Sequence, residues 1–204
     1  MRIAVFGTGE VGSAVAGKLK AIGHDVVFGS RHPRDPQDGI AVLSHEDAAR
    51  HGEWVVNALH GEDALAVFPK LPMAGKLLVD IGNFQSAIDG PVTQTLGEAL
   101  QRALPQTRVV KALNFVSAQL MGEPQRLEGT HTVFVASDDA NARGEVIRLL
   151  ESFGWKDVLD LGDLTACRAM EQLAPMWIRL NQKLGHVYFN LAVVRAPEGG
   201  DQGG

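Results

Sequence analysis

Residues 2–12 read RIAVFGTGEVG, and this stretch decides the fold. A short apolar run comes first, and Gly7, Gly9 and Gly12 follow it in the spacing G-x-G-x-x-G. A strand, a glycine turn and a helix in this order are typical of a dinucleotide-binding unit. Gly7 makes the tight turn, Gly9 lets the backbone approach a pyrophosphate, and Gly12 lets the helix pack on the strand. The N–H groups of Thr8 to Gly12 then face the phosphates.

Further short apolar runs alternate with helix-like segments along the chain. They are rich in Val, Ile and Leu and continuous, as expected for parallel strands covered on both faces. Strands are predicted at 2–7, 25–29, 53–59, 76–82, 108–113, 132–137 and 156–162, and helices at 10–22, 46–51, 62–69, 93–103 and 139–153. This alternation predicts an α/β, Rossmann-type fold over residues 1–162, with a doubly wound, mostly parallel sheet.

The pattern changes from residue 163 onward. Residues 163–195 carry no strand signal and are apolar on more than one helical face, and Pro175 is expected to kink or split them. We predict a helical extension here. It is either an ordinary core helix pair or a surface that also packs on a second subunit, which would make the protein a homodimer. Residues 196–204 are Gly-rich and predicted to be disordered.

Composition narrows the class of protein. The chain has 204 residues, 45% of them hydrophobic, and a net charge of −5, which argues against a nucleic-acid surface. Cys167 is the single cysteine, so no intrachain disulfide forms. No signal peptide and no membrane-spanning run is recognisable, and the seven histidines lack metal-ligand spacing. We expect a soluble, cytoplasmic protein without a metal site.

A second stretch, FGSRHPR at 28–34, indicates which dinucleotide is bound. It falls where many dinucleotide-binding chains carry a carboxylate that holds the ribose 2′-OH. Here the chain has Ser30 and Arg31, with Arg34 close behind. A hydroxyl and guanidinium groups bind a 2′-phosphate through charge-assisted hydrogen bonds, whereas a carboxylate would repel it. The stretch therefore favours NADP(H) over NAD.

Polar residues follow several later strands, at the edge where a ligand lies in open parallel sheets. Asn83 and Asn114 are best placed to contact the nicotinamide side, unless each merely caps a turn. Lys111 lies inside an apolar run, so it either snorkels or points into the cleft. Ser117 has no histidine partner in sequence and Cys167 is expected to be buried and inert, so no catalytic residue is assigned. Hydride transfer between two bound cofactors needs positioning more than an acid or a base.

Several runs together carry a family resemblance. They are RIAVFGTGEVGSAVAGKL (2–19), VVFGSR (26–31), VVKALNF (109–115) and LESFGWKDVLDLGDL (150–164). With these runs the chain resembles the NADPH-dependent coenzyme F420 reductases over nearly its whole length. VVKALNFVSAQLM (109–121) is also similar to the branch that contains the cytosolic domains of transmembrane metalloreductases, which use NADPH and a flavin.

The resemblance implies a role for individual residues. It implies that Thr8, Gly9, Glu10 and Val11 line the pyrophosphate and that Ser30, Arg31 and Arg34 bind the 2′-phosphate. Around the nicotinamide it implies Ala58, Leu59, His60, Asn83 and Asn114. A second cofactor, F420 or a flavin such as FMN or FAD, would stack on the nicotinamide near 114–118 and the loop 162–164.

Two other functions fit the same residues. One is an NADPH-dependent reductase of a small imine or ketone, in which Lys111 or His60 donates the proton. The other is an NADPH-sensing or binding module without turnover, which acts through a protein partner bound at the apolar C-terminal extension.

Replacement of Arg31 by Ala tests the 2′-phosphate assignment. Loss of one charged hydrogen bond should raise the dissociation constant of NADPH about tenfold or more. The constant for NADH should barely change, because NADH has no 2′-phosphate. Titration of the protein with each nucleotide measures both values, and equal losses for the two would contradict the assignment.

Overall fold

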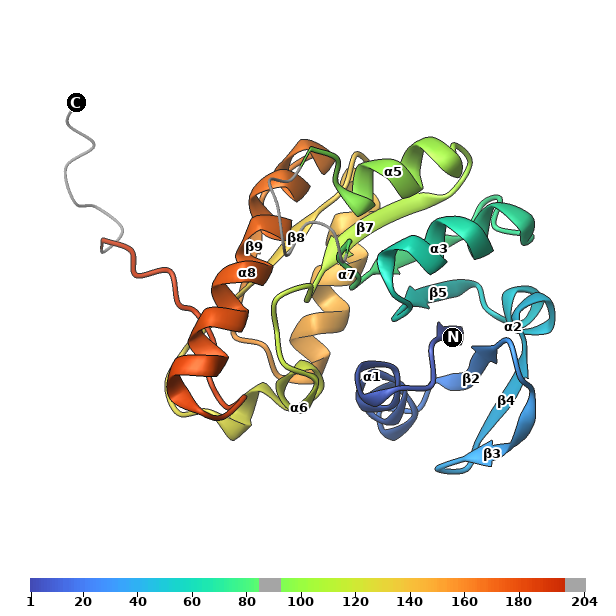
Figure 1. Cartoon of the computed structure of the whole chain (residues 1–204), viewed down its shortest axis with the longest axis horizontal. Coiled ribbons are helices and arrows are strands. Elements are labelled where there is room, and N and C mark those ends of the chain that lie inside the picture. Colours follow the sequence, from blue (N-terminus) through green and yellow to red (C-terminus); the bar gives the residue numbers. More distant parts are fainter. Residues whose placement is uncertain (85–92, 197–204) are drawn as a thin grey trace.

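The computed structural model describes residues 1–84 and 93–196, which form one sheet flanked by helices (Figure 1). Within these residues the sheet has nine strands in the order β3-β4-β2-β1-β5-β6-β7-β8-β9. The strands are Arg2–Phe6 (β1), Asp25–Ser30 (β2), Arg34–Gln37 (β3), Ile40–Ser44 (β4), Trp54–Asn57 (β5), Leu77–Asp80 (β6), Arg108–Ala112 (β7), Thr132–Ala136 (β8) and Asp157–Asp160 (β9). The α/β, mostly parallel architecture predicted from the sequence is confirmed.

Helices cover both faces of the sheet. They are Glu10–Ala21 (α1), His45–His51 (α2), Gly61–Val67 (α3), Leu96–Ala103 (α5), Ala118–Met121 (α6), Ala140–Phe153 (α7) and Cys167–Leu184 (α8), with 3-10 turns at Phe68–Lys70, Pro124–Arg126 and Leu164–Ala166. Residues typical of helix ends lie at two of them. Ser44 caps α2 by accepting from the Asp47 N–H, and α7 ends at Gly154 in the left-handed region, at φ 106°.

Alternation along the central strand β1 separates two hydrophobic clusters. Ile3 and Val5 pack on one face with α1 and α7, whereas Ala4 and Phe6 pack on the other with α2 and α3. Side chains on both faces of β1 are therefore buried, which explains the continuous apolar run that marks the strand in the sequence.

Strand direction decides which loops can meet. β2, β1, β5, β6 and β7 run parallel, so their carboxyl ends share one edge of the sheet. β8 pairs antiparallel with β7, with Lys111 opposite Ala136, and β9 is parallel to β8. The segments that follow β8 and β9 therefore lie at the opposite edge.

A β-hairpin at the other side of the sheet was not predicted. β4 adds parallel to β2, and β3 turns back antiparallel on β4. The hairpin turn is Asp38–Gly39, where both residues have positive φ, 53° and 69°. Such a pair is favoured at two-residue hairpin turns because its twist matches that of the strands. The hairpin carries Arg34, one of the residues predicted to bind the 2′-phosphate.

The C-terminal extension differs from the prediction. α8 continues through Pro175 as one helix. Tertiary contacts hold it on both sides of the proline: Glu171 is buried, and Trp177 stacks on Phe189 with ring centroids 5.5 Å apart. Residues 185–196 are not helical. They return along β8, where the Thr132 N–H donates to the Leu191 carbonyl at 2.9 Å. From residue 197 on, the predicted disordered tail lies outside the described residues.

Cys167 is buried in the core, as predicted. Burial raises the pKa of the Cys167 thiol to about 12, which agrees with the expected inert thiol. Among residues 1–84 and 93–196, no helix is both long and apolar enough to cross a membrane.

Candidate functional site

The glycine turn between β1 and α1 has the shape that its spacing predicts. Gly7 lies at φ 109°, and a Cβ there would come within 2.5 Å of the Ala58 carbonyl oxygen. A Cβ at Gly12 would lie 2.0 Å from the Gly7 carbonyl oxygen, whereas one at Gly9 would meet nothing within 4 Å. Gly9 also caps α1 without any side-chain hydrogen bond. The turn thus offers open space and uncapped N–H groups, which fits a pyrophosphate.

The β3–β4 hairpin lies beside this turn. Gln37 on β3 donates from Nε2 to the Thr8 carbonyl at 3.2 Å and to Ser13 Oγ at 2.8 Å. Its Oε1 accepts from the Arg34 guanidinium. Gln37 thereby connects Arg34, one of the residues predicted to bind the 2′-phosphate, to the glycine turn. Sequence reasoning missed this residue, although the Asp-Gly pair that follows it is a recognisable hairpin signal.

Ser30 and Arg31 follow directly from β2 on the same side. The Ser30 hydroxyl accepts from the His32 N–H at 3.1 Å, and Arg31 is exposed. Burial and the charge of Arg31 lower the pKa of His45, at the start of α2. Ser30, Arg31 and Arg34 therefore present a hydroxyl and two guanidinium groups next to the glycine turn. A 2′-phosphate needs such a set of donors.

A pocket of about 560 Å³ lies at the carboxyl edge of the parallel strands. It is bounded by the start of α1, by the segments after β5, β6 and β7, by α6 and by α8. Seven predicted site residues line it together: Glu10, Val11, Ala58, Leu59, His60, Asn83 and Asn114. Sequence reasoning did not place Trp177 or Ile178 of α8 there.

Asn83 and Asn114 contact each other instead of only capping their own turns. Asn83 Nδ2 donates to the Asn114 carbonyl at 2.7 Å, and Asn114 Nδ2 donates to Asn83 Oδ1 at 3.0 Å. Asn114 Nδ2 also reaches the Met170 carbonyl of α8 at 2.9 Å. Leu113, just before Asn114, has φ 59°, a conformation rare for leucine. The chain therefore accepts local strain where Asn114 joins the pocket wall to α8.

Three buried polar atoms of the pocket residues have no hydrogen-bond partner within the described residues. They are Asn114 Oδ1, Ser117 Oγ and Trp177 Nε1. A buried polar group without a partner costs about 1–3 kcal/mol, so such groups usually meet water or a ligand. All three atoms are closed to solvent in this structure, so a ligand would reach them only after a local shift of the pocket wall.

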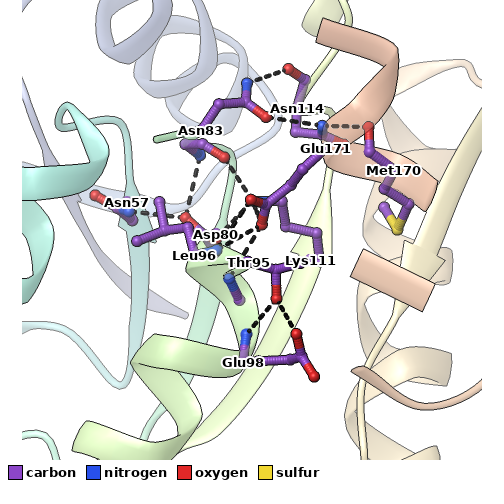
Figure 2. A network of polar contacts seen from close by, with 12 residues as sticks. Asn57, Asp80, Asn83, Thr95, Leu96, Glu98, Lys111, Asn114, Met170 and Glu171 are labelled. Atoms are coloured by element: carbon purple, nitrogen blue, oxygen red, sulfur yellow. Dashed lines mark hydrogen bonds and ion pairs between the residues drawn. The ribbon is translucent and has the colours of Figure 1, made fainter. Parts of the chain in front are cut away.

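Lys111 neither snorkels nor points into the cleft, which corrects both predictions. Its side chain is 0% exposed and its Nζ lies 2.9 Å from Asp80 Oδ2 and 2.9 Å from Glu171 Oε1, both also fully buried (Figure 2). We call these three residues the buried triad. Burial acts to lower the pKa of Lys111, but the charges of Asp80 and Glu171 outweigh it and raise that pKa above its usual value. Lys111 is therefore a structural cation.

The predicted second-cofactor loop at 162–164 does not line this pocket. β9 runs opposite to β7, so the loop follows it at the other edge of the sheet, where the Ser137 N–H donates to the Gly162 carbonyl. Leu164 is 2% exposed and packs in the core with Cys167. Of the two predicted segments, only 114–118 reaches the pocket. Within the described residues, no cluster of three or more His, Cys, Asp or Glu could hold a metal ion.

The fold and the site define an α/β dinucleotide-binding protein. Ser30, Arg31 and Arg34 lie on one side of its glycine turn and the pocket lies on the other. A family model for coenzyme F420-dependent NADP oxidoreductases matches residues 2–84. A crystal structure of a protein assigned as an F420-dependent NADP-reductase from Arthrobacter sp. FB24 is 39% identical, with a TM-score of 0.87. The match covers 96% of this chain and 100% of that one. The chain therefore belongs to the family of coenzyme F420-dependent NADP oxidoreductases.

Two curated relatives represent two branches of similarity. The F420-dependent NADP reductase of Methanocaldococcus jannaschii is 27% identical over 90% of this chain and 93% of its own length. The human metalloreductase STEAP2 is also 27% identical, over 84% of this chain but 35% of its own length. The chain thus spans about a third of the metalloreductase.

Replacement of Lys111 by Met tests its structural role. The variant leaves two buried carboxylates without their cation, so the free energy of unfolding should fall by about 3–5 kcal/mol. Urea denaturation measures the change. Lys156→Met, at an exposed position, is the matched control and should change it by less than about 0.5 kcal/mol. A stable Lys111→Met variant would contradict the structural assignment.

Proposed function

We propose that this protein transfers a hydride between NADP(H) and a deazaflavin (F420) or flavin acceptor. The observation that carries the proposal is the arrangement along one edge of the sheet. Three parts follow one another there: the group of Ser30, Arg31 and Arg34, the glycine turn, and the pocket. They stand in the order of the 2′-phosphate, the pyrophosphate and the nicotinamide. Family membership and relatives named as F420-dependent NADP reductases support the same acceptor class.

On the NADP(H) side, each residue would act by binding and orienting. The N–H groups at the start of α1 would bind the pyrophosphate, and Ser30, Arg31 and Arg34 would bind the 2′-phosphate. Gln37 would hold Arg34 in place against the glycine turn. Ala58, Leu59 and His60 would border the nicotinamide, since they follow β5 into the pocket.

On the acceptor side, the pocket walls would hold a second flat ring against the nicotinamide. Phe115, Val116 and Ile178 supply apolar walls that exclude water. When bound, NADPH supplies a hydride, which leaves its nicotinamide cationic and reduces the acceptor, and a proton from water completes the reduction. No protein acid or base is needed for this exchange.

The two other functions are left with narrower support. Lys111 is buried in the triad, so a reductase of small imines or ketones would have to rely on His60, which is exposed at the pocket. An NADPH-sensing module would bind the nucleotide without turnover. A cytoplasmic location stays a prediction from the sequence.

A comparison of acceptors tests the proposed reaction. NADPH oxidation is followed by absorbance with F420, FMN, FAD and small imines and ketones, and NADPH binding is titrated separately. We expect turnover with F420 or a flavin. Turnover with imines or ketones alone would support the rival reductase, and tight NADPH binding with no turnover would support the sensing module.

Gly9→Ala tests whether the measured activity arises at this site. An added methyl group at Gly9 meets no protein atom within 4 Å, and its φ of −79° suits alanine, so the variant should fold normally. The methyl group would project toward the bound pyrophosphate, and NADPH binding and turnover should both fall at least about tenfold. Unchanged turnover would mean that the activity arises at another site.

We also propose a homodimer formed through α8 and the segment after it. Exposed apolar side chains gather there, with Met176 54%, Leu184 47% and Val194 94% exposed. A monomer would leave this surface in water. Sedimentation equilibrium should give twice the mass of the 204-residue chain, and Leu184→Asp should shift it toward one chain. A wild-type monomer at micromolar concentration would overturn the proposal.

A further inference from the structure

The buried triad holds more negative than positive groups. Both oxygens of Asp80 accept from N–H donors: Oδ1 from Asn57 and Gly82, and Oδ2 from Lys111. Both oxygens of Glu171 likewise accept from N–H groups at the start of α5, and Oε1 also lies against Lys111. Every carboxyl oxygen faces a donor, an arrangement that suits two carboxylates, because a carboxylate only accepts. The triad thus sets two acidic groups against one ammonium group.

The triad is bonded directly to backbone groups of the pocket wall. Asp80 accepts from the Gly82 N–H at 3.1 Å, and Lys111 donates to the Gly82 carbonyl. Asp80 also binds Asn57 Nδ2 at 2.7 Å, and Asn57 Oδ1 accepts from the Leu59 N–H at 3.1 Å. Gly82 and Leu59 both line the pocket. The excess negative charge of the triad is therefore hydrogen-bonded to the pocket wall that would border the nicotinamide, directly at Gly82 and through Asn57 at Leu59.

The wall on the α8 side is linked to the same charges. Glu171 follows Met170, whose carbonyl accepts from Asn114 Nδ2 at 2.9 Å. Asn114 lines the pocket, and so does Ala174, one turn further along α8. Protein on all sides separates these carboxylates from solvent, so their field is screened far less than that of surface charges.

We propose that Asp80 and Glu171 stabilise the positive charge of the oxidised nicotinamide and so favour hydride release from NADPH. The ring of NADP⁺ carries a charge that the ring of NADPH lacks, so a nearby buried anion binds the oxidised form more tightly. This inference rests on the proposed function, because it assumes that the nicotinamide lies in the pocket. The two carboxylates act as positioning and electrostatic residues and touch neither substrate.

The positive end of α5 offsets part of the charge of Glu171. A glutamine at this position would keep an acceptor oxygen for the N–H groups of α5, so Glu171→Gln is expected to remove one negative charge at nearly constant shape. The direction of the effect therefore does not depend on the helix. NADP⁺ should bind more weakly to the variant, and NADPH should bind almost as before.

The test is the ratio of two dissociation constants, Kd for NADP⁺ over Kd for NADPH, measured by calorimetry without any acceptor. In Glu171→Gln this ratio should rise about fivefold, because the variant removes one weakly screened negative charge behind the pocket wall. Glu98→Gln is the matched control. Glu98 lies in the first turn of α5, the helix whose N–H groups donate to Glu171, but it is partly exposed and outside the triad. The ratio in Glu98→Gln should therefore stay near that of the wild type.

Asp80→Asn removes a charge from the other carboxylate and must shift the ratio in the same direction. It also decides the matter if thermal denaturation shows that Glu171→Gln does not fold. Glu171→Asp keeps the charge and should keep the wild-type ratio. Equal weakening of both nucleotides, or an unchanged ratio in folded variants, would overturn the inference and leave the triad a purely structural device.

Failure of the proposed function would look different. If neither nucleotide bound to the wild-type protein, or if both bound and no F420 or flavin turnover occurred, the proposed reaction would fail on its own. A wild-type protein that binds both nucleotides and reduces an acceptor, with a ratio insensitive to the two carboxylates, would reject the electrostatic inference alone.

Discussion

The ion pairing of Lys111 with Asp80 and Glu171 is the constraint on which the pocket depends. It joins the ends of the neighbouring strands β6 and β7 to the start of α5 and to the second turn of α8. A buried charge is tolerated only when it is paired and hydrogen-bonded, and the triad meets both conditions at every carboxyl oxygen. The backbone at Gly82 is held from both sides by the same residues. The wall of the pocket is therefore fixed by electrostatics as much as by apolar packing.

Features that depend on neighbours in sequence could be predicted, because local geometry alone determines them. The glycine turn is one example, since Gly7 has a positive φ and a Cβ at Gly12 would meet the carbonyl of Gly7 in the same turn. Ser30 and Arg31 are another, because the end of β2 is adjacent to the end of β1 in any sheet of this type. The strands with continuous apolar runs were found for the same reason. Both faces of the sheet are covered, which removes the usual alternation.

Features that depend on distant partners could not be predicted. Lys111 reads as an anomaly inside an apolar strand until Glu171, on a helix far along the chain, is brought to it. The loop at 162–164 was assigned to the wrong edge because apolar runs carry no sign of strand direction, and β8 reverses it. The sequence predicts that Pro175 kinks or splits the C-terminal extension, yet α8 is not split there, and its tertiary contacts outweigh the local cost of about 3 kcal/mol. The β3–β4 hairpin, by contrast, had a readable signal in Asp38–Gly39, which was missed because β3 has no apolar run.

The charges of the site would match those of the ligand from one end to the other. Two guanidinium groups lie where the dianionic 2′-phosphate would bind, and the start of α1 presents its positive end to the pyrophosphate. Beyond the glycine turn the sign changes, because the buried triad carries one more negative than positive group behind the pocket wall. NADP⁺ has the complementary order, with its phosphates at one end and a cationic ring at the other. A fold that only had to hold the dinucleotide would gain little from a buried anion at the ring end. A fold that must also let a hydride leave would gain directly from one.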